Sequence, residues 1–468
     1  MPQEEAIVKL IYLTAAVLFI FGLKGLSHPR TAVRGNFLAA LGMLLAIVVT
    51  LLDNRIVSFQ IIVAGFVVGG LVGVIMAYRS PMTSMPQVVA VFNGFGGGAS
   101  ALAVGAAYME ALKGEWIEEI TIQFTASVAM AGIIGAVALT GSAIAFGKLQ
   151  RLITERPVLL PGRHVINITL LLLCLGLGVW QVVDPSGSLP FWAMIGVASL
   201  LGIMLVIPIG GADMPVVISL LNAYSGLAAA GHGWVLNNSV LIIAGSLVGA
   251  AGFILTALMC KAMNRSLANV IFAGVGTVVS SESDEEDIYA GRVKSASAEE
   301  VAMLLSDARR IVIAPGYGLA VAQAQYAIQD LMLLLESRDV EVDFAIHPVA
   351  GRMPGHMNVL LAEANIPYEQ LKELDRINPT FRQTDVVLVI GANDVVNPLA
   401  READPSIPIA GMPILNVDEA RSVVVVKRSL SPGFAGIANP LFAADNALML
   451  FGDAKEVAMD LTAAVKET

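Results

Sequence analysis

The sequence has few charged residues and few cysteines. Asp, Glu, Lys and Arg make up only 14% of its 468 residues, whereas 56% are apolar. Since soluble domains usually carry about 25% charged residues, this composition excludes an ordinary soluble enzyme and a disordered chain. The two cysteines, Cys174 and Cys260, lie in apolar runs and cannot build a disulfide framework or a cysteine-based metal site. The net charge of −10 argues against nucleic-acid binding, which usually needs a basic surface.

The charged residues that are present are unevenly distributed. Residues 1–265 contain 13 Lys and Arg and 10 Asp and Glu, whereas residues 266–468 contain 15 and 28. The first part has the charge density of a membrane domain, and the second part has that of a soluble domain. We therefore predict a transmembrane domain over 1–265, an acidic linker over 266–289 and a soluble domain over 290–468.

Long apolar runs dominate the first part. A membrane-spanning helix needs about 20 mostly apolar residues. Nine runs meet this requirement, with approximate limits 6–24, 36–52, 57–78, 86–109, 121–147, 165–183, 190–208, 214–231 and 237–260. Basic residues gather in the loops on one side, so the positive-inside rule places the N-terminus outside and the C-terminal domain in the cytoplasm.

Glycines recur within these spans at spacings of three and four residues. They include Gly65, Gly69 and Gly73, then Gly132 and Gly135, then Gly245, Gly249 and Gly252. Such spacing lets helix backbones approach closely in lipid, and it predicts a tightly packed bundle.

In the second part, apolar strands alternate with amphipathic helices. Strands are expected at 311–314, 340–347, 386–390, 423–426 and 448–451, and helices at 298–308, 319–337, 357–364 and 454–465. The first helix begins with a capping-box pattern at Ser297. This alternation predicts a parallel sheet with helices on both faces. The predicted fold is a polytopic α-helical membrane domain with nine spans, followed by a Rossmann-like, doubly wound α/β domain.

A glycine-rich turn follows the first of these strands. Residues 315–321 read Pro-Gly-Tyr-Gly-Leu-Ala-Val, which matches the dinucleotide pattern G-x-G-x-x-G except for Val321 at its last position. Gly316 allows the tight turn, and Gly318 lets backbone N–H groups approach a pyrophosphate at the helix N-terminus. A tight turn that binds no ligand is the alternative.

The ends of two later strands favour NADP over NAD. An NAD site places Asp or Glu at the end of the second strand. Here that strand ends in His347, and a basic residue, Arg352, follows. Lys427 and Arg428 leave the fourth strand, where a cationic pair could hold a 2′-phosphate. A solvated strand end is the alternative for this pair.

The run Gly391-Ala392-Asn393-Asp394 follows the third strand. It lies at the edge of the sheet where ligands bind in such folds, although Asn and Asp are also common in plain turns. His347 and His356 do not have the spacing of a helical metal pair, and we expect no metal.

Together with longer runs, these motifs resemble the beta subunit of the proton-translocating NAD(P) transhydrogenases, from one end of the chain to the other. The resemblance is carried by residues 210–217, 260–266, 315–318, 321–326, 347–364, 391–394 and 427–429. It implies hydride transfer from NADH to NADP coupled to proton entry. NADP(H) would bind to the cytoplasmic domain of this chain, and NAD(H) to a separate alpha subunit with further membrane helices. We expect a dimer of alpha–beta units in the bacterial cytoplasmic (inner) membrane, and no reaction by this chain alone.

The resemblance also implies roles for individual residues. The implied NADP(H)-binding residues are Gly316, Tyr317, Gly318, Val321, Ala322, His347, Ala350, Gly351, Arg352, Gly391, Asn393, Asp394, Lys427, Arg428, Ser429, Gly433, Phe434 and Ala435. The segment 433–436 resembles a lid over the nucleotide. Many relatives have Tyr at the lid position of Phe434, so this chain lacks that hydroxyl. Asp394 resembles the acidic residue that couples nucleotide state to protonation.

Polar residues within the spans are candidates for the proton path, because such groups are costly at membrane depth. They are Asn93 in the fourth span, Asn222 in the eighth, and Asp213 at the cytoplasmic start of the eighth. Well-studied relatives carry His where this chain has Asn93, and other members place the His in the partner. We predict a partner His here. Interhelical hydrogen bonding is the alternative for the two asparagines, and a helix cap is the alternative for Asp213.

Two other functions would use a similar architecture. An ion channel or secondary transporter regulated by a cytosolic nucleotide-binding domain should show an NAD-type acid and a substrate site near the membrane midplane. The missing acid and the Lys427–Arg428 pair disfavour it. A membrane-anchored NADP oxidoreductase without ion transport would need its own substrate pocket and general acid, and the sequence has no evident set of residues for these.

Overall fold

The computed structural model describes residues 2–26, 29–51, 59–81, 84–114, 120–154, 157–263, 267–272, 289, 291–352, 355–402, 409–433 and 435–468. The chain forms two compact units, Met1–Thr256 and Ala257–Thr468, which we call the helical unit and the sheet unit. Most of the predicted linker, 266–289, lies outside the described residues.

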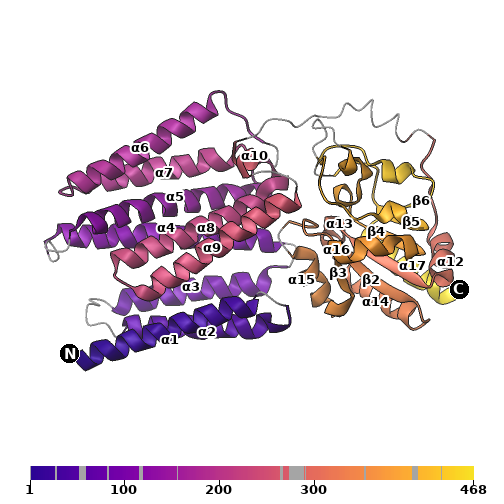
Figure 1. Cartoon of the computed structure of the whole chain (residues 1–468), viewed down its shortest axis with the longest axis horizontal. Helices are drawn as coiled ribbons and strands as arrows, with labels where there is room; N and C mark the ends of the chain where they lie inside the picture. Colours follow the sequence, from indigo (N-terminus) through magenta and orange to yellow (C-terminus); the bar gives the residue numbers. More distant parts are fainter. Residues whose placement is uncertain are drawn as a thin grey trace. The chain divides into compact units, whose positions relative to one another are not determined.

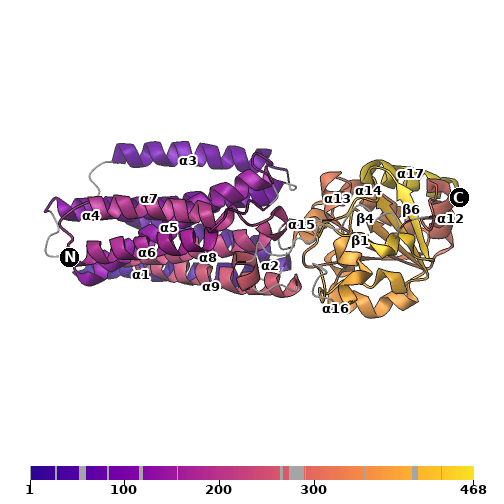
Figure 2. The same cartoon turned by 90° about the horizontal axis from the view of Figure 1, so that it is seen from above.

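Within the described residues, nine helices are long and apolar enough to cross a membrane. They are α1 (Pro2–Leu26), α2 (Pro29–Leu51), α3 (Phe59–Arg79), α4 (Met85–Leu112), α5 (Ile122–Leu149), α6 (Arg163–Val183), α7 (Leu189–Val206), α8 (Met214–Val235) and α9 (Ser239–Ala262). Figures 1 and 2 show the axes of these helices lying roughly parallel to one another, with successive helices alternating in chain direction. The prediction of nine spans is confirmed.

Glycines bring the backbones of the central helices together. A Cβ on Gly135 of α5 would lie 2.5 Å from the carbonyl oxygen of Gly97 on α4. A Cβ on Gly226 of α8 would overlap the amide nitrogen of Gly249 on α9, and one on Gly252 would lie 2.7 Å from the amide nitrogen of Ala223. These contacts are the close backbone approach that the glycine spacing predicted.

The third helix, α3, does not follow this pattern. None of its residues is buried, and nothing lies within 4 Å of a Cβ built on Gly65, Gly69 or Gly73. The prediction of tight packing is therefore wrong for these three glycines within the described chain. Glycine spacing only permits close approach, and a second helix must be present to use it.

The sheet unit contains six parallel strands in the order β3-β2-β1-β4-β5-β6. They are β1 (Arg310–Pro315), β2 (Glu341–Ile346), β3 (Leu371–Glu373), β4 (Val386–Ile390), β5 (Ser422–Lys427) and β6 (Ala447–Phe451). The strand order reverses between β1 and β4, so the carboxyl ends of these two strands border the position where ligands bind in open α/β sheets.

Both faces of the sheet are covered. On one face, the helix α17 (Ala454–Glu467) packs against both α12 (Ala298–Asp307) and α14 (Gln325–Glu336). On the other face, Val312, Val387 and Val423 pack with Phe381 and Phe442, which come from short helical segments between strands. The predicted capping box is present at Ser297. The Rossmann-like, doubly wound fold is thus confirmed.

Two local predictions differ from the structure. The helix expected at 319–337 is divided into α13 (Tyr317–Val321) and α14, because Gln323 adopts a left-handed backbone (φ +50°) that ends the first helix. The strand β3 was not predicted. It has only three residues and pairs with β2 at the edge of the sheet, so it is too short to show a period of its own. A further helix, α15 (His356–Glu363), follows β2 and matches the helix expected at 357–364.

Candidate functional site

The turns after β1 and β4 contact each other at the point where the strand order reverses. The N–H of Gly316 donates to Ile390 O (2.8 Å), and the N–H of Gly318 donates to Gly391 O (2.9 Å). A Cβ on Gly316 would overlap Ala392, and a Cβ on Gly318 would lie 2.6 Å from Gly391 Cα. Both glycines of the pattern are therefore required by the contact between the two turns, whatever the turns bind.

Val321, at the last position of the glycine pattern, does not share the close contact that Gly316 and Gly318 make. Val321 ends the five-residue helix α13, and its side chain is 48% exposed; Ala322 follows it, half-buried. In the usual pattern the third glycine allows a helix to pack closely on the sheet. Val321 does not have this role, because the chain turns away two residues later, at Gln323.

A neutral histidine occupies the end of β2. His347 is buried, its Nε2 lies 2.7 Å from Pro413 O, and its Nδ1 accepts the Val349 N–H (3.2 Å). Since Nδ1 is an acceptor, Nε2 carries the proton and donates. Burial lowers the pKa of His347 to about 4, although the hydrogen bond to Pro413 opposes this shift. The strand end therefore carries no charge at pH 7 where an NAD site would have a carboxylate.

The loop after β2 is joined to the glycine turn. The Arg352 guanidinium lies over the Tyr317 ring, 4.6 Å from its centroid, and the Arg352 N–H donates to His356 Nδ1 (3.0 Å). Gly351 has a positive φ of +109° and packs against His356, where a Cβ would lie 2.6 Å from the histidine Cβ. Ala350 is buried in the same loop. The structure therefore brings together Arg352 and Tyr317, two residues predicted to bind nucleotide.

Asp394 follows β4 and is buried, with 2% of its surface exposed. Its Oδ2 accepts the N–H of Ala435 (3.1 Å), and Gly433 lies so close to the carboxyl group that no Cβ would fit. Phe434, the residue between them, lies outside the described residues. The candidate lid is thus held to the carboxyl edge of the sheet through Asp394.

Lys427 ends β5 near this carboxylate. Its Nζ donates to Ser431 O (2.7 Å) and lies 4.7 Å from the centroid of the Phe442 ring. Burial lowers the pKa of Lys427 to about 8, and the negative charge of Asp394 partly offsets this effect. A half-buried ammonium group that uses one of its three donors for Ser431 can offer the others to an anion, and the nearby Asp394 carboxylate opposes such binding.

The neighbouring cation, Arg428, is paired with another group. Its Nη2 donates to Asp453 Oδ2, and this hydrogen bond lowers the pKa of Asp453. Ser429 follows, with its Oγ 2.9 Å from Ser431 Oγ. The three residues predicted to hold a 2′-phosphate therefore lie together at the end of β5, but Arg428 is engaged by a carboxylate 25 positions along the chain.

Asn439 was not recognised from the sequence. It is fully buried, and its Nδ2 donates to both the main-chain and side-chain oxygens of Asn393 (3.1 Å each). Asn393 in turn donates to Ser431 O (3.3 Å). An asparagine directly before Pro440 was the available signal, since Asn-Pro often begins a turn. Asn439, Ser431 and Asp453 support the candidate residues without having been predicted.

In the helical unit, Asn93 joins three helices. It is buried on α4, its Nδ2 donates to Ser142 Oγ on α5 (2.9 Å), and its main-chain oxygen accepts from Ser225 Oγ on α8 (3.1 Å). Asn222 is half-buried, one turn before Ser225 on α8. Asp213 occupies the N-cap position of the same helix but makes no side-chain cap hydrogen bond. The structure therefore links Asn93 to the helix that carries the other two candidates.

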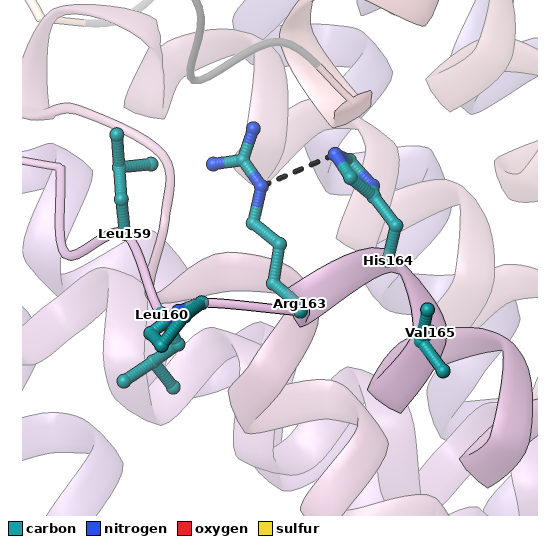
Figure 3. Close-up of a pocket in the computed structure, with 7 residues that line it drawn as sticks. Leu159, Leu160, Arg163, His164 and Val165 are labelled. Atoms are coloured by element: carbon teal, nitrogen blue, oxygen red, sulfur yellow. Dashed lines mark hydrogen bonds between the residues drawn. The ribbon is translucent and has the colours of Figure 1, made fainter.

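A shallow hollow in the helical unit holds none of the predicted residues. It is lined by the consecutive residues 159–165, and Figure 3 shows Arg163 Nε donating to His164 Nε2 (3.3 Å) beside Leu159 and Leu160. An open hollow formed by one stretch of chain is a surface feature of the segment that leads into α6. We assign it no role in the candidate chemistry.

The fold and the site together define a class of protein: a multi-pass membrane protein that carries a Rossmann-like domain with a dinucleotide-type glycine turn. A model of the family described as NAD(P) transhydrogenase beta subunit matches residues 8–464. Two relatives, each described as NAD(P) transhydrogenase subunit beta, come from Rhodospirillum rubrum and from a named strain of that species. Each is 47% identical over 456 residues, which are 97% of this chain and 98% of the relative. The chain belongs to the family of NAD(P) transhydrogenase beta subunits.

Proposed function

We propose that this chain binds NADP(H) at the carboxyl edge of its sheet and couples hydride transfer from NADH to proton translocation. The observation that carries the proposal is the group Lys427, Arg428 and Ser429 at the end of β5. At the same edge of the sheet, the end of β2 carries the neutral His347 and no carboxylate. Two cations and a hydroxyl suit the 2′-phosphate that distinguishes NADP from NAD.

The residues of the site would bind and orient the nucleotide. Lys427 can keep its bond to Ser431 and still reach a phosphate, because an ammonium group has three donors. Arg428 would exchange Asp453 for the phosphate, and Arg352 would face the pyrophosphate region from above Tyr317. Bound NADP(H) supplies the nicotinamide that takes or gives the hydride. The protein contributes positioning and the exclusion of water.

Asp394 is suited to link nucleotide state to protonation. Its ionised carboxylate accepts the Ala435 N–H and stabilises the charge of Lys427. Protonation of Asp394 would weaken both interactions and release the segment that contains Gly433 and Ala435. Coupling needs states that differ in affinity for NADP and NADPH, and channel protonation would shift their populations.

The proton would cross the helical unit near Asn93, Asn222 and Asp213. Asn93 cannot titrate, so it would order water or accept hydrogen bonds while a histidine in the membrane segment of the partner carries the proton. The partner is an alpha subunit that binds NAD(H), and two alpha–beta units would form the complex. The N-terminus would lie outside a bacterial cytoplasmic membrane and the sheet unit in the cytoplasm.

Reconstitution with the alpha subunit tests this function. The full chain and its partner are placed in liposomes, and NADPH formation from NADH is followed together with a pH-sensitive dye. A proton gradient directed toward the side of the membrane that carries the sheet unit should accelerate NADPH formation, and an uncoupler should remove the acceleration. Hydride transfer that is indifferent to the gradient, or nucleotide binding by this chain that prefers NADH to NADPH, would contradict the proposal.

A further inference from the structure

His232 lies in a membrane-spanning helix, and neither the proposed nucleotide site nor the proton path through Asn93, Asn222 and Asp213 includes it. It lies in the last turn of α8, which extends to Val235. The predicted eighth span ends at residue 231, whereas α8 continues beyond it and includes His232. Its Nε2 is buried and has no hydrogen-bond partner among the described residues. An ionisable group at such a position is costly and is a functional candidate by default.

The side chain continues the polar face of α8. Asn222, Ser225 and His232 are separated by three and seven residues, so they fall within an arc of about 80° on the helix. Ser225 donates to the Asn93 carbonyl on α4, which shows that this face is directed toward α4. His232 lies on the same face about 10.5 Å beyond Ser225, at the end opposite Asp213. One face of α8 therefore carries polar residues along most of its length.

The helices around His232 bring few charges to it. On α5, Ala131 packs against Gly231, and on α9, Ile242 packs against Gly233; neither 121–131 nor 239–249 contains an ionisable residue. At the C-terminal end of α4, Tyr108 donates to the carbonyls of Pro185 and Gly187, and Glu110 and the C-cap residue Lys113 are exposed.

Other acidic groups belong to the adjoining connections. Asp184, after α6, is exposed and accepts from Ser186. The acidic residues of 115–119 lie outside the described chain. Among the described residues no hydrogen bond to the buried His232 Nε2 is present, and we take water as the partner of this ring.

We propose that His232 is a titratable station on the proton path, at the end of α8 that faces the outside. The inference rests on the proposed proton translocation and adds a group in this chain to the histidine expected in the partner. The neutral ring accepts a proton from outside water and becomes an imidazolium. Loss of a proton to water held near Ser225, Asn93 and Asn222 restores the neutral ring. One N–H bond forms and one breaks, and no electrons are transferred.

The test uses the complete alpha–beta complex in liposomes. His232→Gln keeps a polar side chain of similar size but removes titration, His232→Glu keeps a titratable group, and His164→Gln is the matched control at the start of α6. Proton uptake and hydride transfer are measured from pH 5.5 to 8.5, and NADPH affinity is measured separately.

We expect His232→Gln to reduce proton-coupled hydride transfer by about tenfold or more and to flatten its pH profile. We expect His232→Glu to retain part of the coupling with a profile shifted to lower pH, and His164→Gln to match the wild type. NADPH affinity should be unchanged in all three. If His232→Gln does not accumulate, an unshifted profile in His232→Glu overturns the inference.

Two other outcomes separate this inference from the proposed function. If the wild-type and His232→Gln complexes take up protons equally and with the same pH profile, the role of His232 alone is overturned. A wild-type complex that transfers hydride without proton uptake overturns the proposed function, and the inference falls with it.

Discussion

The helical unit and the sheet unit stabilise their functional residues in different ways. In the helical unit, Asn93, Ser142 and Ser225 form neutral hydrogen bonds between helices whose backbones meet at glycines. At the edge of the sheet unit, Lys427 and Arg428 are charged and hold protein groups that a phosphate could replace. Breaking a polar contact inside a membrane is expensive because lipid tails offer no hydrogen bond to replace it, whereas ion pairs near bulk water exchange at little cost. The hydrogen bonds of the helical unit therefore favour a stable assembly, whereas the cations at the sheet edge can exchange protein partners for a phosphate.

The substitution with the largest expected effect disrupts the glycine contact between α8 and α9. Gly226→Leu would place a side chain into the backbone of Gly249, and the two helices would have to separate. We expect a loss of about 3 kcal/mol or more, seen as little folded protein in the membrane and a lower melting temperature in detergent. Gly69→Leu on α3 is the control, since nothing lies within 4 Å of that position. Equal behaviour of the two variants, expressed without the partner, would show that the contact does not stabilise the unit.

The next effect concerns the cation at the end of β5. Lys427→Ala should weaken NADPH binding by about 1.5 to 3 kcal/mol, or roughly 10- to 100-fold, because a charge-assisted contact to the 2′-phosphate is lost. Isothermal titration calorimetry of the full chain in detergent measures the NADPH affinity, and the affinity for NADH should change little. Lys455→Ala, an exposed lysine on α17, is the control. An equal loss for NADH and NADPH would assign Lys427 to another part of the nucleotide.

The lowered pKa of Lys427 predicts that NADPH affinity depends on pH. The pKa of Lys427 is lowered to about 8, so the ammonium form is present below this pH and is lost above it. A phosphate binds the charged form, and NADPH affinity should therefore be level from about pH 7 to 8 and then fall by up to tenfold for each further pH unit. Titrations at several pH values measure the slope. Lys427→Arg should remove it, since Arg stays charged. A slope that survives in Lys427→Arg would mean that another group titrates.

The smallest effect concerns the ion pair of Arg428. Asp453→Asn keeps an acceptor at the N-cap of α17 but releases the guanidinium group. We expect NADPH affinity to rise about twofold to fivefold at low salt and less at high salt, because exposed pairs are weak and screened. Glu419→Gln, which breaks the separate pair with Arg382, is the control. A fall in affinity would show instead that Asp453 holds Arg428 in its binding position.

Much of the fold could be predicted because its signals are local. The apolar spans are set by length and hydropathy. The capping box at Ser297 and the apolar strands of the sheet are visible within a few neighbouring residues. Three features are not visible in the local sequence: the break at Gln323, the three-residue strand β3 and the extension of α8 past residue 231. Each depends on backbone conformation or pairing that neighbouring residues do not specify.

The candidate site was predictable only in part. Lys427, Arg428 and Asp394 could be predicted from the sequence, because each lies at or shortly after the end of a recognisable strand. They could not indicate that Asp453 engages Arg428, or that Asn439 supports Asn393, since these pairs are separated by 25 and 46 positions.

The amino-acid sequence alone predicts the division into a membrane part and an α/β part, the number of spans and the residue types at each strand end, since all of these follow from local composition and order. Which glycines touch another backbone depends on how the helices pack, and among the described residues those of α3 touch nothing. The tertiary structure also brings Ser225 to Asn93 across 132 positions of the chain. Such contacts depend on which elements meet in space, and packing of the whole chain decides that.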